Sequence, residues 1–182
     1  IVIGEIRDTE PALEALRAAQ PGRLVLSTLH CDDSVDAIRR LRGLGVNPAT
    51  LSSELAAVIS QRLVRRICPQ CRAPAEPDPR LMAELFPEGP PAGFTPRAGT
   101  GCERCRRRGT LGRIVANDFL VVDTELRRRI AADVDAEALR EAALRGGLKP
   151  LRERLLELVV EGVVPLSELP RSLSVEQLAP SR

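Results

Sequence analysis

Two short apolar runs separated by an amphipathic segment predict an α/β fold. The first run, Ile1–Ile3, has three β-branched residues in a row, which is typical of a strand buried on both faces. Residues 9–20 carry leucine and alanine at helical spacing and stop at Pro21-Gly22. The second apolar run covers residues 23–29. Strand, helix and strand in this order predict two parallel neighbouring strands joined by a right-handed crossover.

The next segment continues the α/β pattern. A helix that runs through Leu44 is predicted, with cap candidates at residues 32–34. A second helix starts at Asn47 and carries apolar positions as far as Ile59. Residues 62–67 are a third strand candidate, so the α/β pattern extends to the first of the paired cysteines.

The pattern changes at Cys68. Residues 68–113 hold most of the prolines and all four paired cysteines, with one short helical stretch near residues 81–85. Residues 114–122 are strand-like again, and three helices with Asp123, Asp135 and Leu151 at or near their starts follow, before short turns and a tail. We therefore expect three segments, residues 1–67, 68–113 and 114–182.

The composition is that of a globular, charge-balanced chain. Of 182 residues, 43% are hydrophobic and 29% charged, and the net charge of +2 is too small to indicate a nucleic-acid partner by itself. Three phenylalanines are the only aromatic residues, which leaves little surface for base stacking. There is no signal peptide and no apolar run of transmembrane length, so we expect a cytoplasmic protein, peripheral to a membrane at most. The sequence starts inside a strand without methionine, so we also expect a fragment of a longer protein.

Four of the five cysteines form two CxxC pairs, Cys68 with Cys71 and Cys102 with Cys105, separated by 30 residues. Each pair turns two thiolates toward one point, and the two pairs complete a tetrahedral site that suits Zn²⁺. A redox pair is the alternative, but a redox CxxC needs no second pair. Four thiolates leave no open coordination position, so the predicted metal site is structural rather than catalytic.

Arginines surround the second cysteine pair, at Arg104, Arg106, Arg107, Arg108 and Arg113. Their positive charge is expected to favour thiolate over thiol. The same cluster is compatible with a nucleic-acid-binding zinc ribbon, with anionic lipid, with an acidic protein partner, or with a solvated face. The near-neutral net charge and the lack of tyrosine and tryptophan argue against the first, so no nucleic-acid partner is expected.

Glu5 follows the first apolar run directly. Gly4 would let the chain turn out of the sheet and put Glu5 at the carboxyl end of the strand, where open α/β sheets bind ligands. A carboxylate there can orient or deprotonate the water that attacks a phosphate. An ordinary strand end with a solvated acid is the alternative.

His30 is the only histidine and follows the second apolar run, after Ser27-Thr28. A lone histidine often has a purely structural role. If the two strands are parallel neighbours, however, His30 lies at the same sheet edge as Glu5, where an imidazole could contact a terminal phosphate. Cys31 has no paired cysteine and is interpreted as a space-filling residue.

Several segments, in this order, closely resemble the secretion ATPases of type II secretion and type IV pilus assembly. They are Gly4–Asp8, Leu24–His30, Gln61–Cys71, Gly101-Cys102, Gly112–Ile114, Gly147 and Leu151–Glu153. The resemblance covers nearly the whole chain. It implies the second half of a RecA-like ATPase core in residues 1–67, a zinc-binding subdomain in residues 68–113, and a C-terminal strand and helical subdomain in residues 114–182.

The resemblance also implies functional residues. Ile1–Asp8 would be the Walker B strand, with Glu5 as the catalytic carboxylate, and Ser27–His30 would be the segment called the His box, with His30 as the second catalytic residue. The nucleotide-binding residues would be Gly4, Arg7, Ser27 and Thr28. The cofactors implied are ATP, Mg²⁺ and Zn²⁺, the last held by Cys68, Cys71, Cys102 and Cys105.

A member of this family would be a cytoplasmic, ring-forming ATPase, expected as a hexamer, that acts on the platform proteins of the inner membrane. Retraction ATPases of the family lack the zinc module, so secretion or pilus assembly is expected rather than retraction. A catalytically inactive, truncated scaffold relative is the leading alternative. A zinc-ribbon module that binds nucleic acid is the second.

The chain departs from the family pattern at three places. Cys31-Asp32 stands where Thr-Asn is common, Val115–Asp118 replaces a segment with glycine and an acidic residue, and Pro170 interrupts the last helix. The sequence also contains no GxxxxGKS or GxxxxGKT motif, so the loop that cradles phosphates, its lysine and the hydroxyl that binds Mg²⁺ are absent from residues 1–182. The chain by itself is therefore expected to lack ATPase activity.

Overall fold

The computed structural model of the protein describes residues 1–76 and 78–178. The chain forms two compact units, the first from residues 1–60 and 118–149, and the second from residues 61–117 and the residues from Pro150 onward. Both units contain helices and strands, so the α/β class predicted from the sequence is confirmed. Residues 68–113 lie entirely in the second unit, whereas the predicted C-terminal segment contributes to both.

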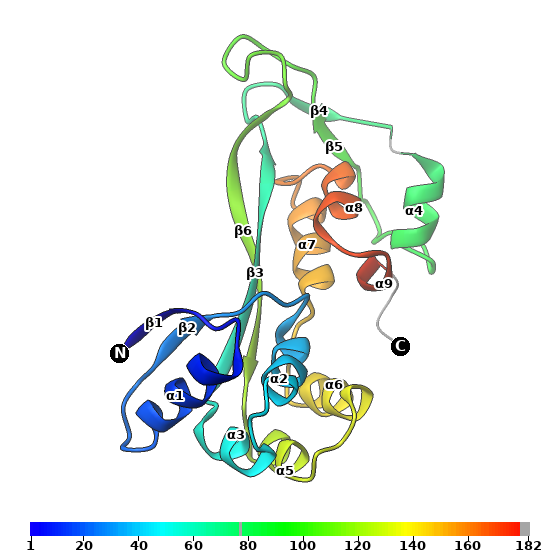
Figure 1. Ribbon diagram of the computed structural model, residues 1–182. Helices are drawn as coiled ribbons and strands as arrows, with labels where there is room; N and C mark the ends of the chain where they lie inside the picture. The colour runs from blue at the N-terminus through cyan, green and yellow to red at the C-terminus, as the bar shows by residue number, and fades with distance from the viewer. Residues whose placement is uncertain (77, 179–182) are drawn as a thin grey trace. The chain divides into compact units, whose positions relative to one another are not determined.

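Two parallel strands open the first unit. β1 (Val2–Glu5) pairs with β2 (Leu26–Thr28), and α1 (Thr9–Ala19) connects them, as the strand–helix–strand pattern predicts (Figure 1). The register places Val2 opposite Leu26 and Glu5 opposite Thr28, so β1 has an irregularity of the bulge type between its two paired positions. The carboxyl ends of both strands therefore reach the same edge.

β1 is not buried on both faces, contrary to the expectation from its β-branched residues. Val2 is 80% exposed, whereas Ile3 packs against the core of the first unit. Within the described residues β2 is the only strand hydrogen-bonded to β1, so one face of the strand lies on the core and the other is open. Gly4 does not turn the chain out of the sheet either, because it lies within β1 and its carbonyl is bound by the Thr28 hydroxyl.

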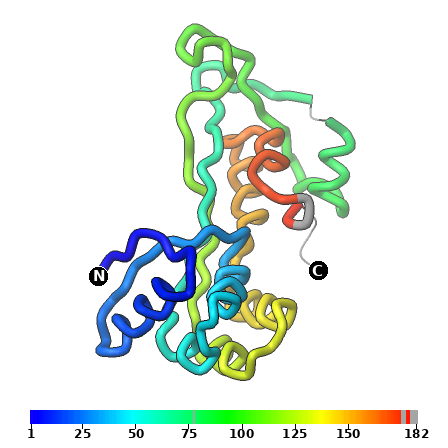
Figure 2. The backbone as a smooth tube through the Cα atoms, viewed as in Figure 1, coloured from blue at the N-terminus to red at the C-terminus, as the bar shows by residue number. Residues whose placement is uncertain are grey.

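Four further helices complete the first unit. They are α2 (Ser34–Gly43), α3 (Pro48–Glu54), α5 (Thr124–Ala131) and α6 (Ala136–Arg145). Each begins with a side-chain cap that accepts a backbone N–H, from Asp33, Asn47, Asp123 and Asp135 respectively. One apolar core joins helices from both chain segments, which lie side by side in Figure 2. Ile38, Leu51, Leu126 and Leu139 all belong to this core.

The helix predicted to reach Ile59 ends earlier. α3 stops at Glu54, and β3 (Ala57–Ile67) includes Val58 and Ile59 and pairs with β6 (Thr110–Val121). Their β-branched side chains favour a strand, and pairing with β6 outweighs the helical spacing of the apolar positions. Both strands are longer than the predicted ranges 62–67 and 114–122.

The second unit combines a small antiparallel pair with helices. β4 (Arg72–Pro74) pairs with β5 (Arg97–Gly99), and neither strand is predicted from the sequence. The predicted helices are present as α4 (Pro79–Leu85) and α7 (Leu151–Val160).

The segment predicted as turns and tail is helical instead. It forms the 3₁₀ turn η1 (Leu166–Glu168) and the short helices α8 (Leu169–Ser172) and α9 (Val175–Leu178). Leu166, Leu169 and Leu173 are buried in the core of this unit, and this burial orders a segment that has no helical periodicity of its own. Pro180 lies outside the described residues. In the part of the chain that the structure describes, no helix has the length and apolar character needed to cross a membrane.

Arginine side chains bind the carboxyl ends of helices within each unit. In the first unit Arg42 donates to the carbonyl oxygens of Ile130 and Val134, and Arg127 donates to those of Ser52 and Ser53. In the second unit Arg152 is 8% exposed and donates to the carbonyl oxygens of Leu85 and Leu178, each at 2.7 Å. The guanidinium fork thus supplies donors to carbonyls at or just after the ends of helices.

Candidate functional site

The edge of the β1–β2 pair brings together the acid and the histidine that the sequence singles out. Glu5 is the last residue of β1, and His30 follows the end of β2 by two residues. The Nε2 atom of His30 lies 2.9 Å from Oε1 of Glu5, and an Arg7 guanidinium nitrogen lies 2.6 Å from Oε2. Two side chains, Arg7 and His30, therefore converge on the Glu5 carboxylate from two chain segments.

These three side chains differ in exposure. The Glu5 side chain is 24% exposed, whereas that of His30 is 88% exposed. The hydrogen bond from Arg7 holds the pKa of Glu5 below its ordinary value, partly opposed by desolvation, with a smaller contribution from the charge of His30. The carboxylate is thus ionised at neutral pH and can accept a proton or orient a polar molecule, and the imidazole beside it faces outward.

The other residues predicted at this edge lie in the two strands themselves, Gly4 in β1 and Ser27 and Thr28 in β2. The Thr28 hydroxyl donates to the carbonyl oxygen of Gly4 at 2.9 Å, and the backbone N–H of Ile6 donates to the Thr28 carbonyl at the same distance. Ser27 is exposed on β2, and successive strand residues point to opposite faces, so Ser27 and Thr28 do not share a face. Thr28 therefore ties the ends of the strands together, and Arg7 is the edge residue that contacts Glu5.

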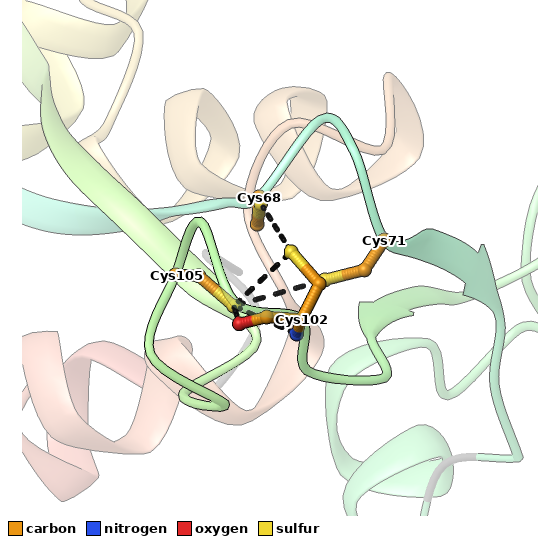
Figure 3. Close-up of side chains that lie close together, drawn as sticks. All are labelled: Cys68, Cys71, Cys102 and Cys105. Atoms are coloured by element: carbon orange, nitrogen blue, oxygen red, sulfur yellow. Dashed lines mark hydrogen bonds between the residues drawn. The ribbon is translucent and has the colours of Figure 1, made fainter.

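The four paired cysteines converge in the second unit (Figure 3). All four sulfur atoms lie within 4.8 Å of one another. The Sγ–Sγ distance is 3.8 Å for Cys68 and Cys102, 3.9 Å for Cys71 and Cys105, and 3.8 Å within the second pair. Four ligands about 2.3 Å from a zinc ion lie about 3.8 Å apart in a regular tetrahedron, so the cluster fits a tetrahedral metal ion. Cys31, which is half-buried, is not part of it.

Backbone N–H groups point at the sulfur atoms. Gly101 donates to Cys71 Sγ at 3.3 Å, Cys102 donates to Cys105 Sγ at 3.2 Å, and Gly109 donates to the same sulfur at 3.3 Å. Hydrogen bonds from N–H groups stabilise a negative charge on sulfur, which is the form that binds a metal.

Two of these donors are glycines with a positive φ, 93° at Gly101 and 72° at Gly109. A Cβ at Gly109 would lie 2.4 Å from the Gly99 carbonyl oxygen, so only glycine fits there.

Backbone N–H groups are the main cause that favours the thiolate at Cys105. The N–H groups of Cys102 and Gly109 lower the pKa of Cys105 to about 6. Burial raises the pKa of the Cys71 thiol to about 11. Sequence reasoning found the four sulfur atoms but not the backbone donors, although the glycines beside the second cysteine pair were the available signal.

The fold and the two sites define an α/β protein with an acid–imidazole pair at a parallel sheet edge and a separate four-cysteine cluster. The chain belongs to the type II/IV secretion system protein family, whose family model matches residues 1–171.

Curated relatives match almost the whole chain. The type IV pilus assembly ATPase PilB of Thermus thermophilus is 43% identical over 170 residues, which is 93% of this chain and 19% of that protein. The putative type II secretion system protein E of Escherichia coli is 41% identical over 174 residues, 96% of this chain and 35% of that protein. The type II secretion system ATPase E of Vibrio cholerae is 36% identical over 171 residues, 94% of this chain and 34% of that protein. The chain thus spans about a fifth to a third of the length of these relatives.

Solved structures support the fold. The pilus retraction motor PilT with bound ADP has a TM-score of 0.58 at 22% identity, covering 98% of this chain and 38% of that one. The ATPase DotB of Legionella pneumophila has a TM-score of 0.61 at 19% identity, covering 92% of this chain and 36% of that one. At these identities the likeness concerns the fold alone.

Proposed function

We propose that the chain is the C-terminal part of a cytoplasmic ATPase that powers type II protein secretion or type IV pilus assembly. Residues 1–67 would form most of the second half of a RecA-like core and residues 68–113 the zinc module, while residues 114–182 would contribute to both compact units rather than form a separate subdomain. The observation that carries the proposal is the 2.9 Å contact between Glu5 and His30 at the carboxyl ends of two parallel strands. It occurs in a chain 43% identical to a pilus assembly ATPase over 170 residues.

In this proposal Glu5 orients the water that attacks the terminal phosphate of ATP and accepts its proton. Arg7 keeps the Glu5 carboxylate ionised. His30, the most exposed of the three side chains, would reach toward the phosphate. Gly4, Ser27 and Thr28 would contribute to the nucleotide site from the ends of β1 and β2, with Ser27 and Thr28 on opposite faces of β2. Residues 1–182 contain no GxxxxGKS or GxxxxGKT loop. The lysine that binds phosphate and the hydroxyl that binds Mg²⁺ would therefore come from such a loop in another part of the parent protein.

We further propose that Cys68, Cys71, Cys102 and Cys105 hold a structural zinc ion. The metal would neutralise part of the thiolate charge and fix the two loops, with no role in hydrolysis. The parent protein would assemble into a ring, a hexamer in this proposal, and act on inner-membrane platform proteins from the cytoplasmic side.

The test uses the full-length protein that contains this chain. Glu5→Gln is expected to keep ATP binding and abolish turnover, because the amide has nearly the same shape but does not accept the proton of the attacking water. His30→Ala is expected to lower turnover and leave the fold intact, since the side chain is 88% exposed. Phosphate release and nucleotide binding are measured on both variants, with Glu14→Gln, an exposed acid on α1, as the matched control.

Two results would contradict the proposal. Hydrolysis at the wild-type rate by the Glu5→Gln variant would remove Glu5 from the mechanism. A full-length wild-type protein that binds its partners but neither binds nor hydrolyses ATP would instead favour an inactive scaffold. The absence of a phosphate-binding loop from residues 1–182 is the observation that favours that alternative.

A further inference from the structure

Five exposed arginines lie close together in the sequence, at and after the second cysteine pair, and the proposed function does not use them. This basic surface consists of Arg104, Arg106, Arg107, Arg108 and Arg113, all of them exposed. Among residues 1–76 and 78–178 none of the five forms an ion pair. Other exposed arginines, such as Arg39 and Arg128, are paired with an acid of their own helix.

Positive charge is concentrated in this segment, whereas basic and acidic residues nearly balance over the whole chain. Residues 102–113 contain five arginines and one glutamate, although the whole chain has a net charge of only +2. A divalent metal with four thiolates has two negative charges in excess, which offsets only part of this positive charge. The segment therefore stays positive in the metal-bound state.

The backbone that carries the basic surface is held by hydrogen bonds to the cysteine pair. Arg106 and Arg107 have positive φ values of 52° and 60°, and the Arg107 N–H donates to the Cys102 carbonyl oxygen at 2.8 Å. Arg108 donates through Nε to the carbonyl oxygen of Cys105 at 3.3 Å. The cysteine pair thus fixes the backbone that presents the arginines, which lowers the entropy cost of binding a partner.

An apolar patch continues from the basic surface along the strands of the same unit. Val64 of β3 and Ala116 of β6 belong to the core of the second unit, so the alternate residues Leu63 and Val115 face away from it. Leu63 is 63% exposed and Val115 is 48% exposed. Arg113 precedes Val115 by two residues and shares its face, which joins the apolar patch to the basic surface.

From these observations we propose that the basic surface and the Leu63–Val115 patch bind an acidic protein segment that also carries apolar side chains. Arginines whose charges are not paired within the unit complement carboxylates, and the patch complements aliphatic side chains. This inference concerns partner recognition and does not rest on the proposed ATPase activity.

Neither a membrane nor a nucleic acid matches the surface as well. Leu63 and Val115 lie on β-strands and the basic surface lies mostly on a loop, so among its described residues the site contains no amphipathic helix of the kind that lies in a membrane interface. Base stacking has no aromatic platform at the basic surface either. Phe86 and Phe94 pack on each other with ring centroids 5.3 Å apart, and the exposed Phe119 belongs to the first unit.

The test measures binding to the whole chain in its zinc-loaded form, without nucleotide. The first probe is a labelled peptide of about 12 residues in which every second residue is glutamate and the residues between are leucine or serine. The other two probes are vesicles of phosphatidylcholine with phosphatidylglycerol and a short DNA duplex. Two variants are tested. The first combines Arg104→Gln, Arg107→Gln and Arg113→Gln, and the second combines Leu63→Ser and Val115→Thr. The matched control removes the same charge elsewhere, by Arg17→Gln with Arg128→Gln and Arg145→Gln.

We expect the peptide to bind, to weaken with rising salt, and to lose about tenfold in affinity in either test variant while the control stays within about twofold. Zinc content and thermal unfolding show that the variants are folded, and a variant with lysine at the three arginine positions should retain salt-dependent binding. The proposal is overturned if the peptide does not bind, if the test and control variants weaken it equally, or if only vesicles or DNA bind through these arginines. Because no nucleotide is present, the result is independent of ATP hydrolysis.

Discussion

At the scale of single residues, the contact between Glu5 and Arg7 makes a prediction about pH. The pKa of Glu5 is lowered from its ordinary value of 4.5, so the folded chain binds its proton less readily than the unfolded chain. The contact therefore contributes stability that is present above pH 4.5 and is lost as pH falls through the folded pKa. We expect Arg7→Met to raise the pKa of Glu5 in a carbon-detected NMR titration of the glutamate carboxyls.

Arg17→Met is the control for this titration, because Arg17 pairs with Glu14 and not with Glu5. Glu125, whose pKa is lowered by Arg129, serves as the internal reference and should not move in either variant. An unchanged pKa for Glu5 in the Arg7→Met variant would show that Arg7 does not hold the carboxylate.

A second prediction at this scale concerns Arg152. Its guanidinium donates to the last carbonyls of two helices from a buried position, and desolvation lowers its pKa. A lysine has no planar fork and does not serve both carbonyls, so Arg152→Lys should reduce the free energy of unfolding by about 1–3 kcal/mol. Denaturant unfolding measures this, and Arg154→Lys, at an exposed position of the same helix, should change stability by less than about 0.5 kcal/mol. Equal effects of the two substitutions would count against the role given to Arg152.

At the scale of elements, the cysteine cluster predicts the effect of metal removal. Two backbone hydrogen bonds connect the segments that carry the two cysteine pairs. The Cys68 N–H donates to the Gly109 carbonyl, and the Thr100 N–H donates to the Cys71 carbonyl. Structural zinc contributes on the order of 10 kcal/mol to such small sites. Chelation, or serine at any one of the four clustered cysteines, should therefore remove zinc and make residues 68–113 sensitive to protease.

Elemental analysis of the reduced protein should give one zinc ion per chain. Cys31→Ser is the matched control and should leave the zinc content unchanged, because Cys31 lies outside the cluster. A zinc content near zero in protein purified under reducing conditions would contradict the assignment.

Helices with strong local signals are the elements that could be predicted from the sequence. Capping side chains at Asp33, Asn47, Asp123 and Asp135 marked helix starts because a cap depends on only three or four neighbouring residues. The strand at Val58 and Ile59 was missed because its partner, β6, is distant in the sequence. The helical tail was missed because its order comes from burial of leucines in a core assembled from other segments.

The candidate site was also predictable only where its residues depend on short, local sequence patterns. The meeting of Glu5 and His30 followed from one short strand–helix–strand unit. The placement of Arg7 on the carboxylate and the N–H groups of Cys102 and Gly109 on sulfur depend on side-chain and loop geometry that no spacing rule contains. The exposure of β1 was missed because consecutive β-branched residues indicate a strand but not how many other strands or helices pack against it.

At the scale of the whole molecule, the chain by itself is predicted to lack ATPase activity. Positioning of the phosphates and electrostatic stabilisation supply most of the catalysis in phosphoryl transfer, and residues 1–182 lack the phosphate-binding loop that provides most of both. A steady-state phosphate-release assay on the chain should give no turnover above background, with Glu5→Gln as the control for contaminating enzymes. Turnover that disappears in the Glu5→Gln variant would reveal a phosphate site that the sequence does not show.

The division of the first unit between residues 1–60 and 118–149 has a consequence for synthesis on the ribosome. The core partners of Leu16 and Ile38 include Leu126 and Leu139, which are translated only after the intervening stretch. At typical translation rates this delay is roughly 5 to 20 s, during which the early helices expose their apolar faces. We therefore expect nascent chains stalled near residue 110 to bind chaperones that recognise apolar segments, and chains that extend past residue 149 to be released from them.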